Sequence, residues 1–120
     1  MWIYYNNNPC SINTGDCVIR AISIVTGYTW QKVYAGLCIQ GYTDCGFGNF
    51  NSVWAEYLKE HGFNRYTITG QQTVSEFAER HPHGSYILGT GSHAVAVVDG
   101  NYIDSWDSGN ETPIYYFTKE

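Results

Sequence analysis

Residues 17–26 form the segment that most constrains the fold, because apolar side chains cover nearly every face of the helix they would make. A helix that is apolar all round is stable only where other elements enclose it. Gly27 follows directly and provides a common way for a helix to end. We therefore predict a central, buried helix over 17–26. Its apolar positions are Val18, Ile19, Ala21, Ile22, Ile24 and Val25.

Three further helices are expected before or between the strands. Thr29 is a suitable N-cap for a helix over 30–40, and glycines at 41, 46 and 48 mark a loop after it. An apolar stripe at helical spacing predicts a third helix over 51–61, which Gly62 closes. Thr73 and Glu76 match a capping box, so a short helix is expected over 74–80.

The second half of the chain is dominated by strand-like segments. They cover 85–89, 93–98, 102–106 and 114–118, with a weaker candidate at 65–69, whereas residues 1–16 are rich in turn formers. Helices that precede a run of strands are typical of the α+β class. We predict a single domain over 1–120, with the N-terminal helices packed on a C-terminal, mainly antiparallel sheet.

Charge and hydropathy argue against several classes of partner. The formal net charge is −5, and the six Lys and Arg residues are scattered, so we expect no nucleic-acid binding. No apolar run reaches the roughly 18–20 residues of a membrane span, so no membrane insertion is expected. The N-terminus lacks the charged and apolar regions of a signal peptide. A cytoplasmic location is therefore predicted, in which thiols stay reduced.

The chain has four cysteines, at 10, 17, 38 and 45. Zinc ligands usually occur in pairs two to four residues apart, but six residues separate the members of each pair here. We therefore predict no metal and no cofactor, with a zinc site as the weakest of the alternatives.

Asp99 and Gly100 predict a tight hairpin between the two strands that carry a histidine and an aspartate. This dipeptide favours a two-residue turn of type I′, which pairs Val98 with Asn101. Counting outward, His93 and Asp104 then fall on one face as diagonal neighbours, within reach of a hydrogen bond. Trp106 lies opposite His93, where it would shield that hydrogen bond from water. The geometry predicts an imidazole that a carboxylate orients through one ring nitrogen.

Cys17 stands where the buried helix begins. The positive end of the helix dipole and a nearby imidazolium both lower the pKa of a thiol and favour its nucleophilic thiolate. In the preceding turn, Asn13 offers an amide that, with the backbone N–H of Cys17, is suited to stabilising an oxyanion. The candidate catalytic residues are therefore Cys17, His93 and Asp104, with Asn13 and Trp106 in support.

These segments resemble the papain-like cysteine peptidases. In that family the Cys begins the central helix, the His lies on a strand, and an Asn or Asp on the next strand orients it, commonly before Ser-Trp. The resemblance implies a minimal papain-like fold and a Cys-His-Asp triad. The matching segments are Gly15-Asp16-Cys17, His93-Ala94-Val95-Ala96-Val97 and Asp104-Ser105-Trp106.

Two further resemblances concern the nucleophile segment and the length of the chain. Residues 15–22 are similar to the nucleophile motif of ovarian-tumour-type deubiquitinases, although that motif usually has an Asp where this chain has Thr14. The short chain also resembles small papain-fold proteins of bacteriophage-type genomes, which implies the host cytoplasm. Papain-like enzymes place a Gln about six residues before the Cys, whereas this chain has Ser11 there.

The expected function is that of a cysteine hydrolase, which cleaves a peptide or isopeptide bond of a protein or peptide substrate through a thioester. An acyl transferase needs the same triad and remains an alternative. A binding module that keeps the fold is another, favoured by the missing Gln and by a set of aromatic side chains expected at the surface. These are Trp2, Tyr4, Tyr5, Tyr115 and Tyr116.

Overall fold

The computed structural model describes residues 1–119 and has an α+β architecture in that range. Its four helices are α1 (Cys17–Thr26), α2 (Trp30–Asp44), α3 (Asn51–Glu60) and α4 (Val74–Arg80). The strands are β1 (Trp2–Tyr4), β2 (Asn64–Thr67), β3 (Ser85–Gly89), β4 (Ala94–Val98), β5 (Asn101–Asp104) and β6 (Tyr115–Thr118).

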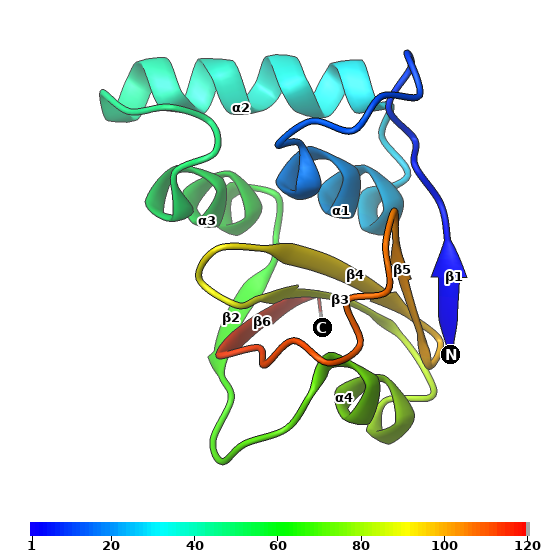
Figure 1. Cartoon of the computed structure of the whole chain (residues 1–120). Coiled ribbons are helices and arrows are strands. Elements are labelled where there is room, and N and C mark those ends of the chain that lie inside the picture. The colour runs from blue at the N-terminus through cyan, green and yellow to red at the C-terminus, as the bar shows by residue number, and fades with distance from the viewer. Residues whose placement is uncertain (120) are drawn as a thin grey trace.

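The six strands form one sheet in the order β1-β5-β4-β3-β6-β2. Every neighbouring pair is antiparallel except β1 and β5, which are parallel. Helices α1, α2 and α3 lie on one side of this sheet, and α4 lies on the other (Figure 1). The predicted class, with helices packed on a mainly antiparallel sheet, is therefore confirmed.

The alternating side chains of β4 divide the core into two halves. Ala94 and Ala96 belong to the half beneath α1, where small side chains admit the helix closely, as its fully buried Ile22 indicates. Val95 and Val97 point to the opposite half, which α4 covers. A buried sheet with both faces covered needs apolar residues at successive positions, which explains why β4 has no polar residue.

The hairpin of β4 and β5 has the predicted register. Val98 pairs with Asn101 and Val97 with Tyr102 across a turn in which Asp99 and Gly100 have φ values of 48° and 85°. Positive φ at both positions is the signature of the type I′ turn. The strands are shorter than expected at their other end, since β4 begins only after His93.

Several helix boundaries follow from local chemistry. Helix α1 spans the predicted 17–26, and Gly27 ends it in the left-handed conformation with φ of 78°. The capping box of α4 is present, with Thr73 and Glu76 each satisfying a backbone N–H of the other. The predicted apolar stripe of α3 is buried throughout. Its members are Val53, Trp54, Tyr57 and Leu58.

Other expectations are wrong. Residues 2–4 form β1, which was expected to be a turn-rich region; no alternation marks it because all three side chains are exposed. Helix α2 continues to Asp44, past Gly41, where a Cβ would come within 2.7 Å of the Gly46 carbonyl oxygen. Gly41 thus permits a close approach of the following loop to the helix. Tyr115, expected at the surface, is buried in the core.

Two observations on residues 1–119 concern membranes and metals. No helix in this range has both the length and the apolar character needed to cross a bilayer. The same residues contain no cluster of three or more His, Cys, Asp or Glu side chains placed to hold a metal ion. Cys10, Cys38 and Cys45 are exposed, whereas Cys17 is half-buried.

Candidate active site

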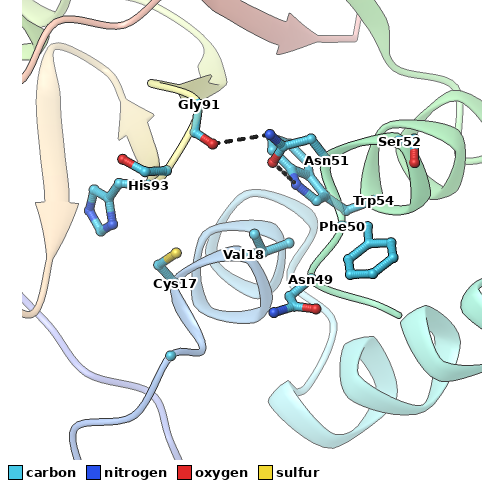
Figure 2. A pocket seen from close by; sticks show the side chains of 11 residues that line it. Cys17, Val18, Asn49, Phe50, Asn51, Ser52, Trp54, Gly91 and His93 are labelled. Carbon is cyan, nitrogen blue, oxygen red and sulfur yellow. Dashed lines mark hydrogen bonds between the residues drawn. The ribbon is translucent and has the colours of Figure 1, made fainter. Parts of the chain in front are cut away.

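Cys17 is the first residue of α1, and the N-terminal end of this helix lies next to the start of β4 (Figures 1 and 2). The side chain is half-buried: it packs against the core cluster on one side and borders a cleft on the other. The first N–H groups of a helix have no intrahelical acceptor. The backbone N–H groups of Cys17 and Val18 are therefore positioned to donate to a negatively charged oxygen formed beside the sulfur.

His93 connects this cysteine to Asp104. Its Nε2 lies 2.7 Å from Asp104 Oδ2, so Nδ1 is the ring nitrogen left to interact with Cys17, which lines the same cleft (Figure 2). The Trp106 indole contacts the imidazole at a centroid distance of 4.9 Å. The four predicted side chains at 17, 93, 104 and 106 are thus brought together, although His93 and Trp106 both lie outside the paired strands.

Asp104 is only 2% exposed and is held by four donors. Its Oδ2 accepts from His93 and from the Ser108 hydroxyl at 2.7 Å. Its Oδ1 accepts from the Ser105 backbone N–H at 2.8 Å and from Arg20 Nη1 at 3.1 Å. A buried carboxylate with this many donors is stable as an anion and has one fixed orientation.

Arg20 is the functional candidate that the sequence prediction missed. It lies about one turn along α1 from Cys17, and its guanidinium bridges two buried carboxylates. Its Nε donates to Asp16 Oδ1 at 2.9 Å, while its Nη1 donates to Asp104 and to the Ser105 hydroxyl. The available signal was a single charged residue within an otherwise apolar helix, four residues after an Asp. Such i,i+4 pairs face each other on a helix.

Asp16 precedes α1 but makes no side-chain hydrogen bond that caps the helix. Its second oxygen, Oδ2, accepts instead from Asn8 Nδ2 at 3.1 Å and from the Trp30 indole N–H at 3.0 Å. These contacts fasten the N-terminal loop and the start of α2 to the end of α1 that carries Cys17. The negative charge of Asp16 is balanced by Arg20 rather than directed at the sulfur.

The surroundings shift the pKa values of the thiol and the imidazole in opposite directions. Burial by itself raises the pKa of the Cys17 thiol, but the His93 hydrogen bond, the Ala94 backbone N–H and nearby positive charge together lower it below its ordinary value. Burial lowers the pKa of His93, yet its hydrogen bonds to Asp104 and Cys17 raise it to about 9. Both shifts favour a thiolate beside an imidazolium at neutral pH.

The two carboxylates of the network stay ionised. Burial raises the pKa of Asp104, but the hydrogen bonds from His93 and Ser108 outweigh it, so the pKa lies below its ordinary value. For Asp16, the donors Asn8, Trp30 and Arg20 likewise overcome burial and lower the pKa. The orienting group of His93 is therefore an anion through the neutral pH range.

The cleft beside Cys17 and His93 is open to solvent and has a volume of about 680 Å³. Figure 2 shows that its far wall comes from the start of α3 and the loop before it. Asn51 ties this wall to the loop before β4, since its Nδ2 donates to the Gly91 carbonyl at 3.1 Å and its Oδ1 accepts from Trp54 Nε1 at 3.0 Å. The space beside the sulfur is thus shaped by residues from both halves of the chain.

Asn13 lies elsewhere. It lines a smaller hollow of about 370 Å³ together with Arg20, Ser105 and Trp106, and it does not line the cleft of Cys17 and His93. The two hollows are separate. Trp106 borders the smaller hollow, and its indole contacts the ring of His93, which borders the Cys17 cleft. The amides that line the Cys17 cleft itself are Asn49 and Asn51.

Comparison with known proteins found no match for this chain. No family model matches the chain, no curated protein matches it, and no solved structure matches it. The likeness to papain-like peptidases therefore rests on the residues quoted from the sequence.

Proposed function

We propose that this chain is a cysteine hydrolase of minimal papain-like fold, which cleaves a peptide or isopeptide bond through a Cys17-His93-Asp104 triad. One observation carries the proposal: a half-buried thiol, an imidazole and a buried carboxylate converge at the edge of an open cleft. A nucleophile beside a base that a third group orients is what covalent acyl transfer to sulfur requires.

In the proposed reaction the Cys17 thiolate attacks the carbonyl carbon, and the carbonyl electron pair moves onto oxygen. The backbone N–H groups at the start of α1 stabilise that oxyanion. As the carbon–nitrogen bond breaks, His93 gives its proton to the leaving amine and a thioester remains. His93 then removes a proton from water, which attacks the thioester, releases the acid and restores the Cys17 thiolate beside the protonated His93.

Asp104 keeps one ring orientation of His93 throughout this cycle. Because its carboxylate occupies Nε2, the proton exchanged with thiol, amine and water is the one on Nδ1. Arg20 and Ser108 hold the carboxylate in turn. The proposed donors to the oxyanion are the backbone N–H groups at the start of α1 alone, because Asn13 lines a separate hollow. Trp106 is the group that shields the His93–Asp104 hydrogen bond.

The first experiment compares the alkylation rate of each cysteine by iodoacetamide at pH 7, followed by peptide mass spectrometry. We expect Cys17 to react at least about tenfold faster than Cys38 and Cys45, because its thiol pKa is lowered. His93→Ala is expected to remove this advantage. Equal rates at Cys17 and the exposed cysteines in the native protein would overturn the proposal.

The second experiment measures peptide-bond cleavage in a mixture of synthetic peptides. Cys17→Ala is expected to abolish cleavage, whereas Cys45→Ala, at an exposed cysteine that lines none of these hollows, is the matched control that retains it. Asn13→Ala is expected to retain cleavage, because Asn13 lies outside the cleft of Cys17 and His93. Added amines distinguish hydrolysis from acyl transfer, since a transferase would yield the amide of the added amine.

A further inference from the structure

The hollows around Gly15 join into one groove, which extends from the Cys17 cleft along the surface of α1 and α2. A second hollow of about 300 Å³ shares Gly15, Val18 and Asn49 with the cleft. A third, of about 520 Å³, shares Gly15 and Tyr34 with the second. Gly15 is therefore common to all three hollows, which adjoin one another between the reactive sulfur and the N-terminal loop and are together called the groove.

Apolar side chains that remain exposed line this groove beyond the cleft. Ile12 is 54% exposed, Tyr34 50% and Phe47 71%. Tyr34 stacks on Trp30 with ring centroids 5.2 Å apart, and Phe47 meets Phe50 edge to face at 5.4 Å. Paired rings of this kind offer rigid apolar walls, and exposed apolar surface joined to a cleft is typical of a binding site.

The groove offers almost no charge to a ligand. Among its lining residues, Asp16 and His93 are the only titratable groups other than cysteine and tyrosine. Asp16 is 4% exposed and already bound to Arg20, Asn8 and Trp30. A charged side chain placed in the groove would lose water and find no counter-charge, which is unfavourable.

We infer that this groove binds an uncharged, apolar stretch of the substrate polypeptide, adjacent to the bond that Cys17 attacks. The inference rests on the proposed function, because the occupant is identified by the continuity of the groove with the reactive sulfur. The chain would thus cleave beside aliphatic or aromatic residues and discriminate against Asp, Glu, Lys and Arg at the same positions.

Gly15 provides a direct way to block the groove. A Cβ added there meets no atom within 4 Å, and the backbone of Gly15 is not in the left-handed region. Gly15→Leu therefore adds bulk at the position shared by the three hollows without a clash at its Cβ. Ala35→Leu, which adds the same kind of bulk at an exposed position of α2 outside the groove, is the matched control.

The test uses the full chain and a library of peptides from a digested, denatured proteome, with cleaved bonds identified by mass spectrometry. Wild type is expected to favour apolar over charged residues within about three positions on one side of the cut by tenfold or more, a typical discrimination for an apolar pocket. Gly15→Leu is expected to lower cleavage at these sites at least about tenfold, whereas Ala35→Leu leaves it unchanged.

Phe47→Lys keeps the test decisive if Gly15→Leu fails to fold. Phe47 is exposed, so the new ammonium is tolerated, and it is expected to raise cleavage beside Asp or Glu severalfold relative to cleavage beside apolar residues. Cleavage without apolar preference, or a preference unchanged in both variants, would overturn the groove assignment alone. No cleavage by wild type, with slow alkylation of Cys17, would overturn the proposed function itself.

Discussion

The two faces of the sheet are covered by different kinds of core. Beneath α1, the apolar cluster borders a chain of buried polar groups from Asp16 through Arg20 to Asp104, and it opens into the cleft. Beneath α4, Phe77 and its neighbours form an apolar cluster with β3, β4 and β5. The comparison indicates that one face combines an apolar core with the polar network of the proposed active site, whereas the α4 face consists of an apolar core.

The largest expected effect comes from Arg20→Met on the α1 face. This change leaves two buried carboxylates without their shared cation, which costs about 3–5 kcal/mol of unfolding free energy. It also removes a positive charge that helps to lower the pKa of the Cys17 thiol, so the alkylation rate should fall in the molecules that remain folded. Urea unfolding and the Cys17 alkylation rate measure the two losses.

Arg20→Lys is the control for this comparison, because it keeps the charge but loses the forked geometry. We expect it to retain part of the Cys17 reactivity. If Arg20→Met were as stable and as reactive as wild type, the polar network would have no role and the contrast between the two faces would disappear.

Phe77→Ala tests the opposite face. Phe77 is 1% exposed and stacks on His81 at a centroid distance of 3.8 Å, so truncation should cost about 3–5 kcal/mol. The Cys17 alkylation rate of the folded fraction should match wild type. Phe77→Leu, which removes less volume, should lose less stability, and a reactivity loss in either variant would contradict the separation of roles.

Asp104→Asn tests the α1 face through the pH dependence of stability. His93 has its pKa raised to about 9, so protonated His93 stabilises the fold fully below its unfolded value of about 6.5, and that stability is lost as pH rises through about 9. Removing the carboxylate charge should lower the His93 pKa by at least about one unit, or ~1.4 kcal/mol.

NMR titration of the His93 ring measures this shift directly. Asp107→Asn is the matched control, because Asp107 binds the Tyr102 hydroxyl rather than His93. An unchanged His93 titration in Asp104→Asn would show that the 2.7 Å contact does not set the charge of the imidazole.

The smallest expected effect is that of Thr73→Ala, at the start of α4. Losing the cap should cost about 1 kcal/mol, since Thr73 Oγ1 accepts from the Glu76 N–H at 3.1 Å. Thr73→Ser keeps the hydroxyl and should remain close to wild type in thermal unfolding. The Cys17 alkylation rate should not change in either variant. A change would show that the α4 face influences the reactivity of Cys17.

The predictable parts of this molecule are those fixed by neighbours in sequence. Asp99-Gly100 set the register of the hairpin because two adjacent positive φ values suit few other residues. This register places His93 within hydrogen-bond distance of Asp104, which is why most of the candidate site could be predicted. The capping box of α4 and the end of α1 at Gly27 are local in the same way.

The features that the sequence does not predict depend on contacts between residues that are far apart in the chain. Strand β1 exists because the Tyr102 N–H donates to the Met1 carbonyl and the Tyr5 N–H to the Asp104 carbonyl, which no local pattern reveals. The position of Asn13 outside the cleft depends on how the N-terminal loop crosses α1. Arg20 had a local signal in Asp16, but its bond to Asp104 spans 84 residues.

That span has a consequence for the chain as it is being made. The segment 17–26 leaves the ribosome well before 93–104, so for much of synthesis the Cys17 sulfur has neither an imidazole nor an ordered Arg20 beside it. Its thiol then behaves like that of an unstructured peptide and is mostly protonated at neutral pH. The lowered thiol pKa on which the proposed function depends therefore arises only once segment 93–104 has folded against α1.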